Sequence, residues 1–172
     1  MKLTEELIAK CDSETVREGL KTLLPYDAYC EINAGDITTY TSVFDLVGRI
    51  PSSLKSLLKV ADGGILFSSI FLCSTKSTLA DLQTELYTFR EVNGEAFRRS
   101  HEIPAEYVCF ALDDSGVYYC VQKGAVSETV YALCPSEDGV LTQWDSIGEW
   151  LSDRAYFYAE MIRDGLIDPM VK

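Results

Sequence analysis

Hydrophobic residues in the first part of the chain recur with the period of an α-helix. After Thr4, whose hydroxyl suits a helix N-cap, apolar positions share one face, and the pattern restarts across residues 12–24. A clearer stripe of leucines follows in SSLKSLLKVA, residues 52–61. Because glycine readily adopts the left-handed geometry that ends helices, we expect Gly63 or Gly64 to terminate this last helix.

Shorter patterns occupy the stretches between these helices. Residues 26–32 are mixed and compatible with a strand, and residues 43–47 with a short helix. The segment ILFSSIFLC, residues 65–73, predicts one strand or a hairpin. Apolar residues between Ser77 and Phe89 then share one helical face, which Asn93–Gly94 interrupts.

The second half of the chain has a different pattern. Four short apolar runs occupy residues 107–112, 117–122, 129–134 and 140–144. The segments DDSG, KGAVSE and PSEDG separate them, and β-rich runs divided by turn residues are typical of an antiparallel meander. A closing helix is predicted from Ser146, which forms a capping box with Glu149, and Trp150 lies on the apolar side of that helix.

Helices, then a meander, then a helix predict a single α+β domain over residues 1–172, with an antiparallel sheet flanked by helices. In residues 107–112, both alternating sets of side chains are apolar. A sheet with one face in water carries polar residues on that face. Either helices of this chain cover both faces, or one face is a surface that binds a partner.

Charge narrows the classes of partner. The 172 residues include 15 Lys and Arg against 27 Asp and Glu, which gives a net charge of −12 and a pI near 4.4. Such a field repels nucleic acid and anionic membranes and attracts basic proteins, although the same charge can serve solubility alone. The longest apolar run is too short to cross a membrane, and the N-terminus carries no apolar signal core. We therefore expect a cytoplasmic protein.

The six cysteines carry no pairing signal. No two of them have the close spacing of a zinc clamp, and His101 is the only histidine. Four of them lie in apolar runs, where a free thiol behaves as a small hydrophobic group. We expect reduced thiols, no metal and no cofactor. The cysteines are Cys11, Cys30, Cys73, Cys109, Cys120 and Cys134.

The stretch ALDDSGVYYC, residues 111–120, offers the clearest candidate chemistry. Asp113 and Asp114 with Ser115 could be acid–base machinery, a metal site or a turn. Asp at the first position and Gly116 at the last are typical of a β-turn, and adjacent side chains of an extended chain point apart. The turn explains all four residues. A small hydrolase using Asp113, Asp114 or His101 is the weaker alternative, because no nucleophile motif accompanies them.

Three segments resemble the SUKH superfamily. IPSSLKSLLKVADGGILF, residues 50–67, resembles its signature of a proline-initiated helix, an acidic residue and glycines, and a strand. The matching residues are Asp62, Gly63 and Gly64. FALDDSGVYYCV, with Gly116, is similar to the strand–turn–strand of the family. SIGEWL, with Ser146 and Trp150, resembles the start of its closing helix. The resemblance spans about residues 40–160.

The resemblance implies a non-enzymatic binding protein. Bacterial members are immunity proteins that neutralise toxins of interbacterial competition, many of them nucleases, and fungal members regulate cell-wall synthesis as scaffolds. We expect a basic toxin domain as the partner. The alternative is a regulatory or scaffold module that binds a non-toxin partner or forms a homodimer. From charge and loop position, the expected contact residues are Asp113, Asp114, Tyr118, Glu137 and Asp138.

Overall fold

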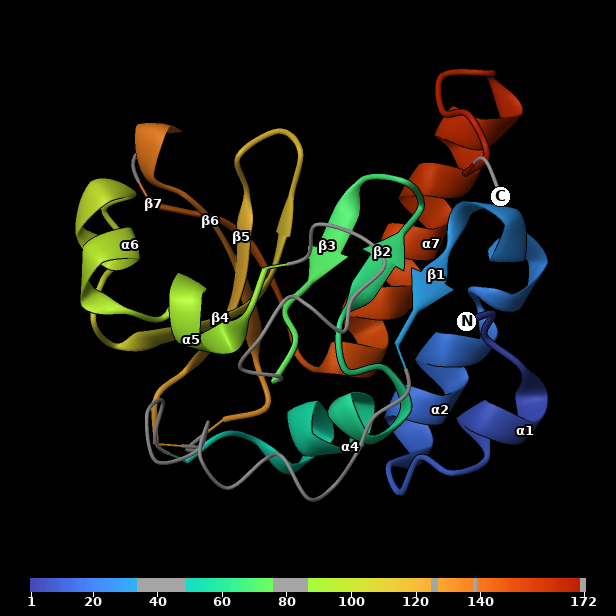
Figure 1. The fold of residues 1–172 in the computed structure, drawn as a ribbon, viewed down its shortest axis with the longest axis horizontal. Coiled ribbons are helices and arrows are strands. Elements are labelled where there is room, and N and C mark those ends of the chain that lie inside the picture. The colour runs from blue at the N-terminus through green and yellow to red at the C-terminus, as the bar shows by residue number, and fades with distance from the viewer. Residues whose placement is uncertain (34–48, 76–86, 125–126, 138, 171–172) are drawn as a thin grey trace.

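The computed structural model describes residues 1–33, 49–75, 87–124, 127–137 and 139–170. Within these residues, one antiparallel sheet forms in which each strand pairs with the next along the chain (Figure 1). The strands are β1 (Glu31–Ile32), β2 (Gly64–Leu66), β3 (Ile70–Leu72), β4 (Tyr107–Asp113), β5 (Tyr118–Gln122), β6 (Val130–Cys134) and β7 (Gly139–Trp144). The predicted α+β class and the four-strand meander are confirmed, and residues 65–73 form the β2–β3 hairpin.

The helices of this fold cover both faces of the central strands. They are α1 (Glu5–Ile8), α2 (Glu14–Lys21), η1 (Leu24–Tyr29), α4 (Ser52–Val60), α5 (Phe89–Val92), α6 (Glu95–Ser100), η4 (Pro135–Glu137) and α7 (Ile147–Arg163). Neighbouring residues of a strand point to opposite faces. Tyr119 of β5 packs against Trp150 of α7, with ring centroids 5.2 Å apart, and Tyr118 packs against Phe97 of α6 at 6.1 Å. The chain's own helices therefore account for the two apolar faces.

The closing helix α7 begins as its sequence predicts. The Ser146 hydroxyl accepts from the Glu149 amide at 3.1 Å. The Glu149 carboxylate accepts in return from the amide of Asp145 at 2.8 Å, one residue before the cap. At its other end, Gly165 has a φ of +70°, and its amide donates to the carbonyl of Ile162 at 3.0 Å. Local capping therefore sets both ends of this helix.

The Asp62–Gly63–Gly64 segment does not cap helix α4 as predicted. The C-cap residue Ala61 is extended, and the glycines with φ of +90° and +149° come after it. A Cβ on Gly64 would overlap the carbonyl oxygen of Glu31, so glycine is needed where β2 meets β1. Asp62 is fully buried and accepts from the amide and hydroxyl of Thr75 at 2.6 and 2.5 Å. The motif therefore joins α4 to the sheet.

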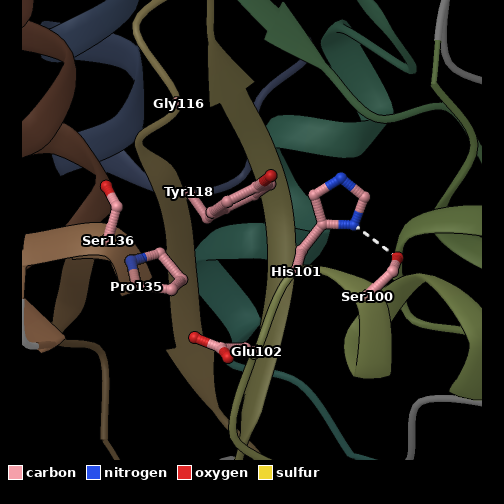
Figure 2. A pocket seen from close by; sticks show the side chains of 7 residues that line it. All are labelled: Ser100, His101, Glu102, Gly116, Tyr118, Pro135 and Ser136. Carbon is pink, nitrogen blue, oxygen red and sulfur yellow. Dashed lines mark hydrogen bonds between the residues drawn. The ribbon is translucent and has the colours of Figure 1, made fainter.

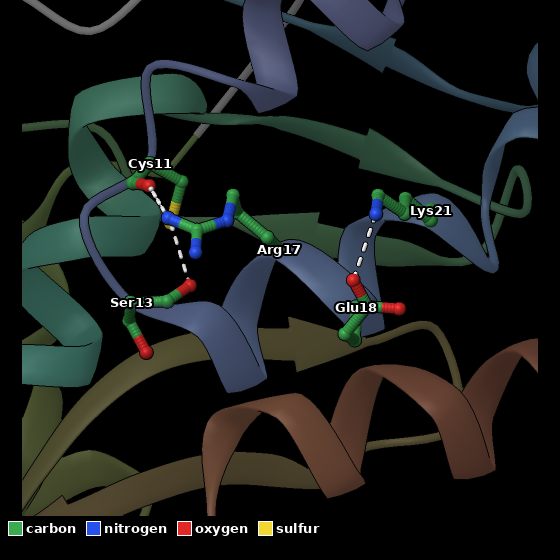
Figure 3. A network of polar contacts seen from close by, with 5 residues as sticks. All are labelled: Cys11, Ser13, Arg17, Glu18 and Lys21. Atoms are coloured by element: carbon green, nitrogen blue, oxygen red, sulfur yellow. Dashed lines mark hydrogen bonds and ion pairs between the residues drawn. The ribbon is translucent and has the colours of Figure 1, made fainter.

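The N-terminal region shows where short patterns mislead. Helix α2 begins where the pattern restarts, with Ser13 as its N-cap. The Arg17 guanidinium donates to the Cys11 carbonyl at 2.7 Å, which fixes the chain between α1 and α2 (Figure 3). Residues 26–32 are mostly the 3-10 helix η1, with a strand only at the last two.

Two other predicted helices are only partly open to comparison. Phe89, predicted as the last apolar residue of a helix after Ser77, is the first residue of α5. The helix predicted at 43–47 and most of the one after Ser77 lie outside the described residues.

All six cysteines are buried and carry free thiols. Cys109 and Cys120 are paired across β4 and β5 in the buried core, and the Cys109 thiol donates to the carbonyl of Ala111 at 3.3 Å. Burial raises the pKa of the Cys73 and Cys120 thiols well above its ordinary value. Burial likewise raises the pKa of Cys30 to about 11. These three thiols therefore stay protonated near neutral pH.

Candidate functional site

Three hairpin turns lie at the same end of the sheet, which we call the hairpin end. They are the β2–β3 turn at 67–69, the β4–β5 turn at 114–117 and the β6–β7 turn, of which residues 135–137 are described (Figure 1). In an antiparallel meander the chain reverses direction at every connection, so every second turn lies at the same end of the strands. The amide of Asp114 donates to the carbonyl of Ser69 at 3.1 Å, which ties two of these turns to each other.

Asp113 builds the β4–β5 turn with its side chain. One carboxylate oxygen accepts from the amide and hydroxyl of Ser115 at 3.0 and 2.7 Å and from the amide of Val117 at 3.1 Å. Its other oxygen accepts from the Tyr119 hydroxyl at 3.0 Å. Gly116 adopts a φ of +89° in the turn. DDSG is thus the predicted turn, and the Asp113 carboxylate is committed to it at 8% exposure.

A cavity of about 250 Å³ opens at the hairpin end, and Figure 2 shows its walls. Three segments of the chain line it. Residues 100–102 form the end of α6 and the two residues after it, Gly116 and Tyr118 come from the β4–β5 hairpin, and Pro135–Ser136 come from the β6–β7 turn. Tyr118 is only 8% exposed, and burial raises the pKa of its phenol. The cavity therefore has a buried aromatic residue in its wall and loop residues around it.

His101 is held against helix α6. Its ring stacks on Phe97, with centroids 3.9 Å apart, and meets Tyr118 edge-on at 5.9 Å. Its Nδ1 lies 2.9 Å from the Phe97 carbonyl, which only accepts, so Nδ1 carries the proton. The Ser100 hydroxyl donates to the same carbonyl at 3.1 Å. Nδ1 is therefore not a base for Ser100, although the two side chains are 3.0 Å apart.

Three acidic side chains lie at or next to the cavity. Glu102 lines it, Asp114 lies in the turn beside Gly116, and Glu137 follows Ser136. All three side chains are exposed, and within the described parts of the chain none of them forms an ion pair with a basic side chain. This end of the molecule is therefore an acidic surface with a hollow in it.

The residues expected to contact a partner differ in exposure and position in the structure. Asp114 and Glu137 are exposed at the hairpin end, Tyr118 lies in the cavity wall, and Asp113 is buried in its turn. Asp138 lies outside the described residues. Four other lining residues were not predicted from the sequence: Ser100 at the end of α6, Glu102 after it, and Pro135 and Ser136 in the β6–β7 turn. Their one sequence signal is a position at or near the end of a helix or strand, which does not say which of these ends meet in the fold.

The structural residues predicted with the site lie mostly elsewhere. Ser146 caps α7, and Trp150 is fully buried, with Phe110 stacked edge-on at 5.1 Å. Gly116 alone among them lines the cavity. A second cavity of about 350 Å³ includes Arg98 and Lys123 in its wall. The Arg98 guanidinium has a structural role there, because it donates to the backbone carbonyls of Asn93 and Pro104 at 3.1 and 2.9 Å.

Among the described residues, no group of three or more His, Cys, Asp and Glu side chains is placed to hold a metal ion. None of the helices in those parts of the chain is both long and apolar enough to span a bilayer.

Comparison with known protein families gives one match. The model of the SMI1 / KNR4 family (SUKH-1) matches residues 45–153, which is more than half of the chain. This span contains the Asp62–Gly63–Gly64 segment, the meander and the start of α7. No curated protein and no solved structure matches the chain.

Proposed function

The chain belongs to the SMI1 / KNR4 family (SUKH-1), and from that premise we propose that it is a cytoplasmic immunity protein, one that binds and neutralises a nuclease-type toxin of interbacterial competition. In this proposal residues 1–172 act as one binding domain. The observation that carries it is the acidic hairpin end, where Glu102, Asp114 and Glu137 surround a cavity without ion-pair partners among the described residues.

Charge explains how such a surface would act. A nuclease binds polyanionic substrate through a basic cleft. A protein of net charge −12 that presents unneutralised carboxylates at one end complements that cleft. The long-range field speeds encounter, and the hairpin turns then occupy the cleft so that nucleic acid is excluded. The same field disfavours nucleic acid and anionic membranes as partners of this protein.

The contacts of the candidate catalytic groups favour binding over turnover. The Asp113 carboxylate is occupied by four hydrogen bonds, and His101 Nδ1 donates to a carbonyl. Asp114 is exposed to water. These groups are already hydrogen-bonded or lie in water and are not held together as a general acid and base, so we place the hydrolase alternative last.

The test is binding to the product of the neighbouring open reading frame. We expect one complex by size exclusion, and we expect Asp114→Lys with Glu137→Lys to slow its association at least about tenfold, because both charges lie in the binding surface. Glu106→Lys with Asp145→Lys is the matched control. It makes the same charge change at the opposite end of the sheet and should slow association less than about twofold. No complex, or equal effects of the two pairs, contradicts the proposal.

A scaffold that binds a non-toxin partner, including a second copy of this chain, is the second candidate. The edge strand β7 favours it, because its residues are exposed with Val140 at 45% and Leu141 at 46%. An exposed uncharged edge can pair with another strand. The sheet faces are covered by helices, so a homodimer would use this edge. A gene neighbourhood without a toxin-like gene, together with a dimer in sedimentation analysis, would favour the scaffold.

A further inference from the structure

We propose that the cavity at the hairpin end is a socket for a single arginine side chain of the protein partner. This inference rests on the proposed function and specifies the chemistry of its binding surface. Four properties of the cavity support it: its size, the state of the Tyr118 hydroxyl, the charge around it and the arrangement of its acceptors.

The size of the cavity suits one side chain. Pockets for cofactors and small-molecule ligands range from roughly 300 to 1,000 Å³. This cavity has about 250 Å³ and is lined by residues from three segments of the chain. A long side chain projecting from a partner can enter it, while the rest of the partner lies on the surrounding turns.

Tyr118 supplies a hydroxyl that has no hydrogen-bond partner among the described residues. Its side chain lines the cavity at 8% exposure of the residue, and the hydroxyl oxygen itself is open to the cavity. In Figure 2 its hydroxyl end points toward the His101 side of the cavity. A ligand that covers this hydroxyl removes it from water, so a ligand that donates a hydrogen bond to it is favoured over one that does not. The phenol ring also attracts a cation.

The charge around the cavity selects a cation. The Glu102 carboxylate lines the cavity, and those of Asp114 and Glu137 flank it in the two turns. An acidic side chain would meet like charges at close range. An aliphatic side chain would leave the Tyr118 hydroxyl unsatisfied. A positively charged donor meets both requirements.

The arrangement of acceptors favours arginine over lysine. Three side chains with oxygen acceptors line the cavity, those of Glu102, Tyr118 and Ser136, and Figure 2 shows their oxygen atoms spread over different parts of it. A guanidinium group presents five N–H donors in a rigid plane and can serve several acceptors at once, whereas an ammonium group is a single point charge.

The test uses the full chain, labelled with ¹⁵N, titrated with N-acetyl-arginine amide. We expect saturable amide shifts in residues 100–102, 116–118 and 136. N-acetyl-citrulline amide, which has nearly the same shape without the charge, should bind at least about tenfold more weakly. Glu102→Gln should weaken binding of the arginine amide about fivefold. Ser136→Tyr, which fills the cavity, should abolish it, and Glu106→Gln should leave it unchanged.

Three results would overturn the socket: equal affinity for the citrulline and arginine amides, an equally tight N-acetyl-lysine amide, or shifts centred outside these segments. The exposed Glu102→Gln variant keeps the test valid if Ser136→Tyr does not fold. The outcome is independent of the toxin experiment. A complex with the toxin whose dissociation constant is unchanged by Glu102→Gln and by a folded Ser136→Tyr contradicts the socket alone. Arginine-amide binding without any toxin complex contradicts the proposed function alone.

Discussion

Asp113 and Asp114 are adjacent and identical in chemistry, yet the fold gives them different roles. The Asp113 carboxylate is buried and accepts hydrogen bonds from Ser115, Val117 and Tyr119. The Asp114 side chain is exposed, and only its backbone is used, by donating to the carbonyl of Ser69. Adjacent residues at a strand end point in opposite directions, so one carboxylate organises the turn and the other remains available at the surface.

Replacing these residues separately should separate the two roles. Asp113→Ala removes an acceptor of four hydrogen bonds and leaves the Tyr119 hydroxyl buried, so we expect the free energy of unfolding to fall by about 2–4 kcal/mol. Asp114→Ala should change it by less than about 0.5 kcal/mol. Urea unfolding followed by circular dichroism measures both. Equal losses in the two variants would show that the turn contacts of Asp113 are not what stabilises this hairpin.

At the scale of elements, the crossing of α2 and α7 depends on two glycines. Gly19 of α2 faces Gly148 of α7, and a Cβ on Gly19 would lie 2.8 Å from the Gly148 carbonyl oxygen. A Cβ on Gly148 would overlap the carbonyl oxygen of Thr15. Backbone atoms cannot yield as a flexible side chain can. The missing side chains therefore let the two helices come into direct backbone contact beside the sheet.

Gly148→Ala should test this crossing. In an isolated helix the change would add about 1 kcal/mol of stability, because alanine is the better helix former. Here we expect a net loss of at least about 2 kcal/mol, because the helices must separate. Thermal unfolding monitored by circular dichroism gives the sign directly. Gly116→Ala is the control for steric overlap, since no atom lies within 4 Å of its Cβ position, and it should cost only about 1–2 kcal/mol through its positive φ. A stabilised Gly148→Ala protein would contradict the close crossing.

At the scale of the whole molecule, burial holds one thiol and two phenols of the core in their neutral forms. Burial raises the pKa of the Cys30 thiol from 9.0 to about 11. Burial, with the negative charge of Asp113, raises the pKa of the Tyr158 phenol from 10.0 to about 12. Burial also raises the pKa of Tyr119 strongly. The folded protein keeps these protons at pH values where the unfolded chain releases them.

The resulting pH dependence lies on the alkaline side. For an acid whose pKa is raised on folding, the stabilisation is fully present below the unfolded pKa and is lost as the pH rises through the folded pKa. The free energy of unfolding should therefore decline between pH 9 and 12, by about 1–2 kcal/mol for each of Cys30 and Tyr158. Urea titrations at intervals across this range measure the slope. Tyr158→Phe should flatten it between pH 10 and 12, and Tyr156→Phe should not, because Tyr156 is 70% exposed. An unchanged slope in Tyr158→Phe would contradict this assignment.

The sequence by itself determined the features that arise from neighbours along the chain. The stripe in residues 52–60, the Ser146 cap and the DDSG turn follow from side chains within a few residues of each other. Strand alternation with turn punctuation likewise predicted the β4–β7 meander. Short mixed runs were less informative: residues 26–32 were compatible with a strand, but most of them belong to the 3-10 helix η1 and only the last two to β1.

Only the tertiary structure decided which distant residues meet. Pairing of β4 with β5 and of β6 with β7 brings the turns of both hairpins to one end, and α6 adds residues 100–102 beside them to form the cavity. Packing also decided that Asp113 is buried. It likewise decided that glycine is needed at position 64 for the close approach to β1, and not to end helix α4. The physical reason is that these roles depend on sheet register and helix docking, which involve residues far apart in the chain and leave no periodic trace in the sequence.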